Sequence, residues 1–347
     1  MMADIVIRRE GRAGRITLDR PQALNALTYA MCRGIDAALI EWAGDPSVAL
    51  VLIDAEGDRA FCAGGDIAEM YATGTAGDLG YGRRFWADEY RMNARIAGYA
   101  KPVVSFLQGF TMGGGVGVGC HGSHRIVGET ATIAMPECSI GLVPDVGGSY
   151  LLATAPGRLG EYLGLTGARM GPGDAILAGF ADHFVPEAGW GALKARLIDT
   201  GDAGAVAEAA RAAPEGRLAA LRGEIGALFA GETLGDIARA LRHARPPFAD
   251  EALAAISRAA PLSAACTVEM IHRLRGNPSM RRALEMEYRF TWRAMEHGDF
   301  IEGIRALIID KDRAPRWRHA GPEAVPMVDV ARMLMPLGAE ALTFGED

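Results

Sequence analysis

Residues 49–67 read ALVLIDAEGDRAFCAGGDI and contain the pattern that decides the fold. Five apolar residues, 49–53, open the run, which is typical of a strand buried on both faces. A glycine-rich loop over 57–65 follows, and a helix is predicted to begin near Asp66. The same order returns downstream, where a buried strand over 103–107 leads into a second glycine-rich turn. Repeated strand, loop and helix predict an α/β architecture whose strand-to-helix loops carry the functional site.

The pattern changes along the chain. Two short strands are predicted over 4–8 and 14–18, and Thr28 is expected to cap a helix that runs to about residue 42. After about residue 187 the pattern is almost wholly helical. The further helices that we predict are 82–97, 203–213, 216–230, 233–245, 248–259, 262–275 and 279–297. We therefore predict a core domain over 1–186 and a helical C-terminal region over 187–347.

Composition excludes several classes of protein. Of the 347 residues 50% are hydrophobic and 23% are charged, so the chain is globular and not disordered. A net charge of −7 argues against a protein whose main task is to bind nucleic acid. No stretch approaches the roughly 20 apolar residues that cross a bilayer, and the N-terminus lacks the apolar core of a signal peptide. The five cysteines form no CxxC pair and no regular framework, and an odd number without a secretory signal predicts reduced thiols and a cytoplasmic protein.

The segment FCAGGDI at 61–67 is the first candidate for chemistry. Its two glycines, Gly64 and Gly65, let the backbone approach a ligand closely. Asp66 is expected to cap the next helix, whose free N–H groups point back into the loop. A well-capped turn between a strand and a helix explains the same residues, so this motif alone leaves both interpretations open.

The segment GFTMGGGVG at 109–117 is the second candidate. Glycine inside a helix costs roughly 1 kcal/mol relative to alanine, so three in succession need a reason. A backbone N–H at such a turn is a natural donor to a carbonyl oxygen that becomes anionic. A phosphate cradle is the competing interpretation. The run is not followed by the acid of a dinucleotide-binding motif and lacks the GK[ST] of a P-loop, which disfavours it.

The segment MPECSIGLVPDVGGSY at 135–150 holds two carboxyl groups, Glu137 and Asp145, in an otherwise apolar stretch. Two nearby carboxyl groups in apolar surroundings can have their pKa values driven apart into an acid and a base. The alternative is that both residues merely cap helices or pair with arginines. The run CHGSH at 120–124 suggests a metal, but no second cluster supplies further ligands, and no GxSxG motif indicates a serine hydrolase. We expect no metal.

Together, FCAGGDI, the GGG turn and the MPE segment resemble the crotonase superfamily, also called the enoyl-CoA hydratase/isomerase family. They occur in that family's order and spacing, from LDRPQALNAL at 18–27 through Val185. The resemblance implies an α/β fold, a crotonase-like spiral of repeated ββα units with a helical C-terminal region. It also implies an acyl-CoA substrate whose carbonyl lies in an oxyanion hole formed by the N–H groups of Gly65 and Gly114. The further substrate contacts that it implies are Glu89, Ala63, Asp66, Ile67 and Gly113.

The acidic residues differ from those of hydratases. Hydratases carry a glutamate two residues after the GGG, where this chain has Gly117, and typically a glycine where it has Asp145. Glu137 matches the second hydratase glutamate. This set resembles the 3-hydroxyisobutyryl-CoA hydrolases of valine catabolism, as do MEYR at 286–289 and DFIEGIRALIIDKD at 299–312.

That resemblance implies a thioester hydrolase that needs no cofactor, since CoA is part of the substrate. It implies that Glu137 attacks the carbonyl or activates water, that Asp145 binds the 3-hydroxyl group and acts at the leaving side, and that Glu89 shapes the pocket. Another crotonase reaction, such as enoyl-CoA hydration or isomerisation, is the alternative. A non-catalytic acyl-CoA binder would keep the glycines and lose the acids. The expected partner is the acyl-CoA, with no nucleic acid and no membrane, and a homo-oligomer is left open.

Overall fold

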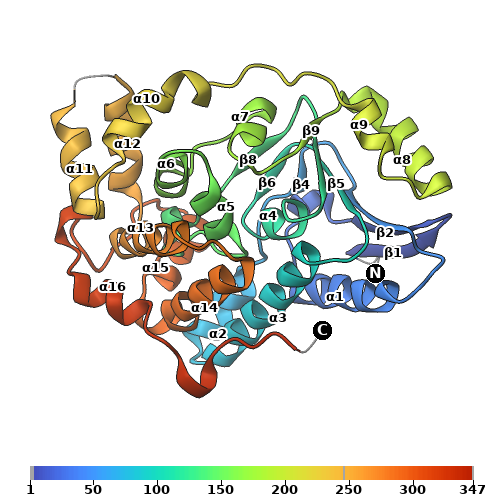
Figure 1. The fold of residues 1–347 in the computed structure, drawn as a ribbon. Coiled ribbons are helices and arrows are strands. Elements are labelled where there is room, and N and C mark those ends of the chain that lie inside the picture. The colour runs from blue at the N-terminus through green and yellow to red at the C-terminus, as the bar shows by residue number, and fades with distance from the viewer. Residues whose placement is uncertain (1–3, 245–246, 346–347) are drawn as a thin grey trace. The chain divides into compact units, whose positions relative to one another are not determined.

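The structure is a computed structural model, and it describes residues 4–244 and 247–345 (Figure 1). The chain forms two compact units that alternate along the sequence. Unit 1 comprises Met1–Asp66, Asp88–Ala134 and Arg169–Ala219, and unit 2 comprises Ile67–Ala87, Met135–Ala168 and Ala220–Asp347. The predicted boundary between residues 186 and 187 divides the chain by sequence pattern, so it is a different division and stays a prediction.

Unit 1 is built on two sheets. The six-stranded sheet has the order β1 (Ile5–Glu10), β2 (Ala13–Leu18), β3 (Leu50–Ala55), β5 (Val103–Leu107), β7 (His124–Val127) and β9 (His183–Phe184). In this sheet β1 and β2 pair antiparallel, and the other neighbouring strands named here pair parallel. The three-stranded sheet is parallel, with the order β4 (Ala60–Cys62), β6 (Phe110–Met112) and β8 (Thr132–Ala134).

The two sheets grow together along the chain. Three consecutive pairs of strands are divided between the sheets in the same way. The first strand of each pair (β3, β5, β7) lies in the larger sheet, and the second (β4, β6, β8) lies in the smaller one. Helical segments follow each pair, for example α4 (Gly114–Gly119) after β6. The chain therefore advances as a spiral, and the predicted repetition of ββα units is confirmed.

Helices cover the larger sheet of unit 1. Thr28 caps α1 (Tyr29–Ala43) by accepting the N–H of Met31 at 3.2 Å, as predicted, and α1 lies against β1 and β2 (Figure 1). α8 (Trp190–Thr200) and α9 (Ala205–Ala209) pack on a core that includes Phe106, whose ring centre lies 5.3 Å from that of Trp190. α7 (Pro172–Leu177) also belongs to this unit.

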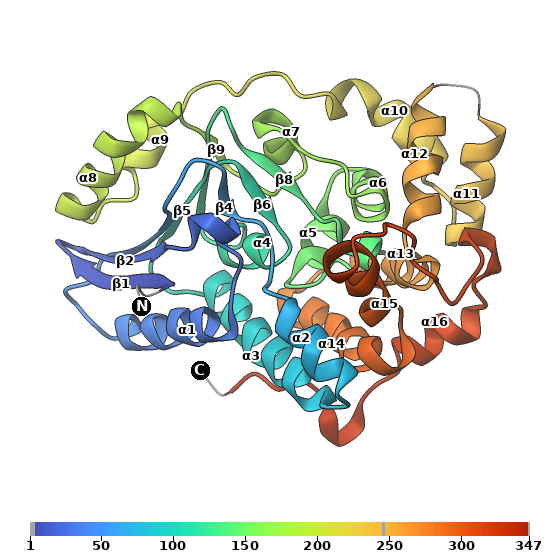
Figure 2. The ribbon, with the colours of Figure 1, turned by 180° about the vertical axis from the view of Figure 1, so that it is seen from behind.

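Unit 2 is helical among its described residues. Its helices are α2 (Ala68–Thr75), α5 (Gly148–Thr154), α6 (Leu159–Thr166), most of α10 (Leu218–Leu228), α11 (Leu234–His243), α12 (Pro247–Arg258), α13 (Pro261–Arg275), α14 (Met280–His297), α15 (Phe300–Ile304) and α16 (Met327–Met333). α13 is its central element, because it contacts α5, α6, α12, α14 and α16 (Figure 2). α3 (Leu79–Ala97) runs from unit 2 into unit 1.

Three local predictions were wrong. The loop predicted over 57–65 contains strand β4. The helix predicted over 203–213 is only α9, because the N–H of Arg211 donates to the carbonyl of Phe184 at 2.8 Å in an antiparallel bridge. Asp66 does not cap α2, which has no side-chain cap, and instead accepts from the Arg20 guanidinium at 3.2 Å.

Within the described residues, no helix is both long and apolar enough to span a membrane.

Candidate active site

The first glycine turn of unit 1 is fixed by the backbone around Leu27. The N–H of Leu27 donates to the Gly64 carbonyl at 2.9 Å, and the N–H of Asp66 donates to the Leu27 carbonyl at 2.8 Å. Gly65 lies between these two bonds, in a parallel bridge with Leu27. Because the two neighbours of Gly65 supply both of these bonds, its own N–H points away from Leu27.

The second glycine turn opens α4. Gly113 has φ 49°, in the region that favours glycine, and Gly114 is the first helical residue, whose N–H has no partner within the helix. A Cβ on Gly115 would lie 2.1 Å from the Cys62 carbonyl oxygen, so this glycine lets α4 pack directly on β4. Close packing therefore explains part of the glycine run.

The two turns meet beside one carboxyl group. A Cβ on Gly114 would lie 3.3 Å from the Gly65 amide nitrogen and 3.1 Å from Oε1 of Glu89, a buried residue of α3. Three of the predicted residues are thus together in unit 1. Ala63 and Gly113 belong to the same two turns, whereas Asp66 pairs with Arg20, and Ile67 stands before α2 in unit 2.

Glu137 begins a short 3-10 turn in unit 2, Glu137–Ile140, which ends at Gly141 with φ 78°. Its side chain is 4% exposed, and its Oε2 atom has no hydrogen-bond partner among the described residues. Burial raises the pKa of Glu137 well above that of an ordinary glutamate, and the negative charges of Asp145 and Glu287 raise it further. A carboxyl group with a raised pKa is a stronger base than an ordinary glutamate once it is ionised.

α15 supports this turn from the C-terminal part of the sequence. A Cβ on Gly303 would lie 2.1 Å from the Ile140 carbonyl oxygen, and a Cβ on Gly141 would lie 2.5 Å from that of Asp299. The N–H of Ala260 also donates to the Cys138 carbonyl at 2.8 Å. The DFIEG stretch therefore has a physical reason for its glycine, namely direct backbone contact with the turn that carries Glu137.

Asp145 stands before a strained turn. Val146 and Gly147 have φ values of 54° and 81°, and the N–H of Gly148 closes the turn on the Asp145 carbonyl at 2.6 Å. A β-branched residue in the left-handed region costs about 1–3 kcal/mol and persists only when its surroundings hold it there. Asp145 itself is buried.

The sequence motifs predict no role for Glu287 of α14, although it lies in the MEYR stretch. This fully buried carboxylate accepts the N–H of Gly147 at 2.8 Å, the N–H of Ser149 at 3.0 Å and the hydroxyl of Ser149. Burial is the largest influence and raises the pKa of Glu287 to about 8, against the hydrogen bonds from Ser149 and Gly147, which lower it. Its position on the apolar face of the helix, one turn after Ala283 and one before Thr291, is the signal in the sequence.

The CHGSH segment shows no sign of a metal centre. Among the residues that the structure describes, no group of three or more His, Cys, Asp or Glu side chains could hold a metal ion. Cys120 is buried, which raises the pKa of its thiol to about 12. Ser123 serves the backbone, because its hydroxyl accepts the N–H of Val103 at 3.0 Å.

The chain belongs to the enoyl-CoA hydratase/isomerase family, whose model matches residues 13–334. It is 37% identical to the mitochondrial 3-hydroxyisobutyryl-CoA hydrolase of Gallus gallus, over 97% of this chain and 90% of the relative. The Homo sapiens protein of the same name is 34% identical, over 98% of this chain and 91% of its own length.

Solved structures agree on the fold. A structure described as an enoyl-CoA hydratase from Rhodobacter sphaeroides 2.4.1 is 62% identical with a TM-score of 0.95, covering 99% of this chain and 100% of that one. One described as a carnitinyl-CoA dehydratase from Mycobacterium thermoresistibile is 41% identical with a TM-score of 0.94, covering 99% of each chain. The crotonase-like fold that the sequence predicts is thereby confirmed.

The prediction of a cytoplasmic protein is contradicted. The curated relatives from Gallus gallus, Rattus norvegicus and Homo sapiens are named as mitochondrial enzymes. The prediction rested on reduced cysteines, and all five are indeed free and buried. Free thiols indicate reducing surroundings without specifying a compartment, which is why the inference failed.

Proposed function

We propose that this chain hydrolyses the thioester of 3-hydroxyisobutyryl-CoA and releases 3-hydroxyisobutyrate and CoA. The observation that carries the proposal is the pair Glu137 and Asp145, both buried in one stretch of unit 2. At the position where hydratases carry their first glutamate, this chain has Gly117. Similarity to 3-hydroxyisobutyryl-CoA hydrolases over nearly the full chain supports it.

The glycine pair of unit 1 is our candidate for the oxyanion hole. The N–H groups of Gly65 and Gly114 would bind the thioester carbonyl oxygen and stabilise the negative charge that develops on it. One such donor contributes about 3–4 kcal/mol to transition-state stabilisation in other enzymes. A Cβ on Gly114 would enter the space beside the Gly65 amide nitrogen, so this glycine keeps that space free of a side chain.

Glu137 is our candidate for the attacking group. It would either add to the carbonyl carbon and displace CoA thiolate, giving an anhydride that water then cleaves, or take a proton from the water that attacks. In both routes one water is consumed, the C–S bond breaks and CoA leaves with a proton. The Oε2 atom of Glu137, buried and without a protein partner among the described residues, fits either route.

Asp145 and Glu89 are our candidates for recognition of the acyl group. Asp145 would accept a hydrogen bond from the 3-hydroxyl and help to protonate or orient the leaving side, and Glu89 would shape the pocket around that hydroxyl. A buried acceptor that matches a substrate hydroxyl discriminates strongly against an analogue without it, whereas one methyl group changes binding by only about 1–3 kcal/mol. Ala63, Asp66, Ile67 and Gly113 remain predicted contacts of the acyl-CoA.

Hydration of an enoyl-CoA is the second candidate function. The 62% identical Rhodobacter sphaeroides structure, described as an enoyl-CoA hydratase, favours it. The hydratases that this chain resembles carry two glutamates for the reaction. The position of the first is occupied here by Gly117, a buried residue of α4 that has no group to transfer a proton. We therefore place hydrolysis first.

The experiment is thiol release from a panel of acyl-CoA thioesters. We expect 3-hydroxyisobutyryl-CoA and 3-hydroxypropionyl-CoA to be cleaved at rates within about a hundredfold of one another, since they differ by one methyl group. Isobutyryl-CoA should be far slower. Equal rates for isobutyryl-CoA and its 3-hydroxy derivative would remove Asp145 from its proposed role.

Two further expectations complete the proposal. The reaction needs no added cofactor, so dialysis against a chelator should leave the rate of thiol release unchanged. A homo-oligomer remains a prediction, which light scattering of the purified protein would test.

A further inference from the structure

We propose that Glu287 is a positioning residue that holds the turn Asp145–Ser149 in one conformation and thereby sets the preference for 3-hydroxyacyl groups. This inference rests on the proposed function, because it acts through the role assigned there to Asp145. Glu287 comes from α14, 140 residues after Gly147 in the sequence.

The turn needs an external support. Val146 and Gly147 both have positive φ, and α5, which follows directly, begins without a side-chain cap from its own N-cap residue. A free turn of this sequence would relax toward the extended or helical regions that valine prefers. Such relaxation would rotate the peptide plane next to Asp145 and move its carboxylate.

Glu287 supplies that support with both of its oxygen atoms. Oε2 accepts the N–H of Gly147 and Oε1 accepts the N–H of Ser149, together with the Ser149 hydroxyl. Two oxygens of one rigid carboxylate thus fix two backbone amides on the same turn. A fully buried carboxyl group is stable only when its oxygen atoms are hydrogen-bonded in this way.

Glu287 is also close enough to the proposed catalytic acids to act on them electrostatically. Its charge raises the pKa of Glu137, and the charge of Asp145 raises that of Glu287. The three carboxyl groups therefore form one cluster in unit 2. The hydrogen bonds place Glu287 as the member that orients the turn, while Asp145 and Glu137 carry the proposed chemistry.

The test is a double-mutant cycle with Glu287→Gln and Asp145→Asn. A glutamine side chain has nearly the same size, but its NH₂ group cannot accept a hydrogen bond. It would therefore face the N–H of either Gly147 or Ser149, and that hydrogen bond would be lost. We expect Glu287→Gln to lower kcat for 3-hydroxyisobutyryl-CoA by about 100-fold, as a small misplacement of an active group does. The ratio of kcat/KM for 3-hydroxyisobutyryl-CoA over isobutyryl-CoA should fall as it does in Asp145→Asn, and the double variant should resemble Asp145→Asn alone.

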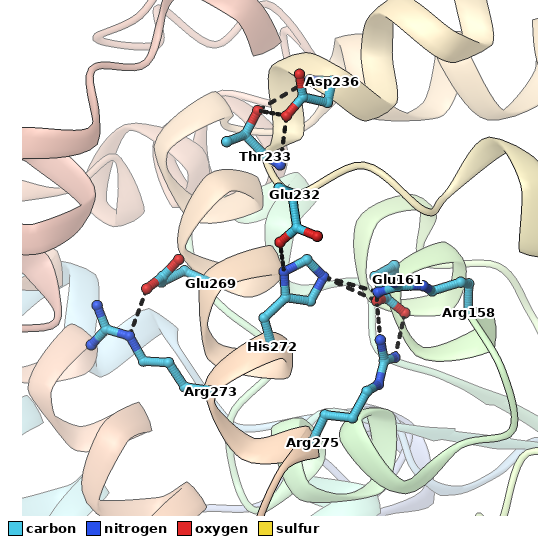
Figure 3. A network of polar contacts seen from close by, with 9 residues as sticks. All are labelled: Arg158, Glu161, Glu232, Thr233, Asp236, Glu269, His272, Arg273 and Arg275. Carbon is cyan, nitrogen blue, oxygen red and sulfur yellow. Dashed lines mark hydrogen bonds and ion pairs between the residues drawn. The ribbon is translucent and has the colours of Figure 1, made fainter.

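Two matched variants separate positioning from general stability. Glu161 is also a fully buried carboxylate of unit 2, but it holds Arg158, His272 and Arg275 instead (Figure 3). Glu161→Gln should lower the melting temperature and leave the substrate ratio unchanged.

Ser149→Ala, which removes a single hydrogen-bond donor to Glu287, should lower the substrate ratio about tenfold, and it keeps the proposal testable if Glu287→Gln does not fold. The buried Ser263→Ala is its control, with no change expected.

Each outcome has a definite meaning. Losses from Glu287→Gln and Asp145→Asn that simply add, with an unchanged substrate ratio in Glu287→Gln and Ser149→Ala, would overturn the positioning role and leave the proposed function intact. An Asp145→Asn variant with the substrate ratio of the unmodified protein would overturn both, because Asp145 would then have no role for Glu287 to support.

Discussion

The amide nitrogen of Gly65 lies 3.3 Å from the point where a Cβ would stand on Gly114. These residues are 49 positions apart, so only the fold brings their backbones together. Any side chain at position 114 would occupy the space between the Gly65 amide and Glu89. The relationship therefore gives a direct test of the proposed oxyanion hole.

Gly114→Ala should reduce kcat/KM for thiol release by about 100-fold, because its methyl group would stand where the carbonyl oxygen must bind. The Cβ would be tightly placed, 3.1 Å from Oε1 of Glu89 and 3.3 Å from the Gly65 amide nitrogen. Alanine favours the helix by roughly 1 kcal/mol over glycine, which offsets this crowding, so the melting temperature should change little. Gly191→Ala in α8 is the matched control, since a Cβ there meets no atom within 4 Å. Full activity of Gly114→Ala would remove this turn from the mechanism.

The acid limb of the rate profile should reflect Glu137. This group must be ionised to attack or to accept a proton, so kcat/KM falls as the pH drops through its pKa. Burial and then Asp145 raise that pKa, so the limb should lie well above the value of 4.5 of an ordinary glutamate. Asp145→Asn removes the neighbouring charge and should shift the limb of its residual activity to lower pH. A limb at or below 4.5 would contradict the assignment.

Glu161 should contribute to stability in acid. Burial alone would raise the pKa of Glu161, but hydrogen bonds from His272, Arg275 and Arg158 overcome it and lower the pKa to about 2 (Figure 3). Because the folded pKa lies below the unfolded one, the stabilisation is fully present above about pH 4.3 and is lost as the pH falls toward 2. Glu161→Gln should therefore destabilise the protein by about 3 kcal/mol at pH 7.

Urea unfolding of the two proteins at several pH values is the measurement. The difference in the free energy of unfolding should shrink between about pH 4.3 and 2. Glu232, whose carboxylate lies 4.0 Å from His272 but is largely exposed, should matter little, so Glu232→Gln serves as the control. A difference that stays constant with pH would refute the ion-pair explanation.

Gly303→Ala should disturb the turn that carries Glu137. Its Cβ would lie 2.1 Å from the Ile140 carbonyl oxygen, which is backbone and cannot turn aside, so α15 and the turn must move apart. We expect a lower melting temperature and a kcat reduced by about tenfold or more. Gly276→Ala, whose Cβ would meet nothing within 4 Å, should change neither. Unchanged kcat in Gly303→Ala would show that α15 does not support Glu137.

The sequence predicted the elements whose signals are local. β3 opens with a continuous apolar run, and β5 is apolar except for Ser105. The cap of α1 depends on one side chain, Thr28, which accepts the N–H of the residue three positions later. β4 and β6 were missed because each has three residues and is defined by pairing with distant strands, not by a pattern of its own. Gly65, Gly114, Glu137 and Asp145 were predicted from motif and resemblance, and their roles stay predictions.

The partners of Glu287 could not be predicted from the sequence. Its partners, Gly147 and Ser149, are about 140 residues away, and a glutamate in a helix is ordinarily interpreted as part of a solvated face. Only packing of α14 against α5 makes it a buried acceptor. The pairing of Asp66 with Arg20 is a second long-range contact of this kind, and it displaced the predicted helix cap.

The most direct test of the central claim compares two reactions of the same purified protein. Thiol release from 3-hydroxyisobutyryl-CoA is measured with a thiol reagent, and hydration of crotonyl-CoA is measured by loss of the enoyl absorbance. With Asp145 present and Gly117 in place of an acid, we expect kcat/KM for hydrolysis to exceed that for hydration by about 100-fold or more, the contribution of one general acid–base group. Faster hydration than hydrolysis would contradict the account.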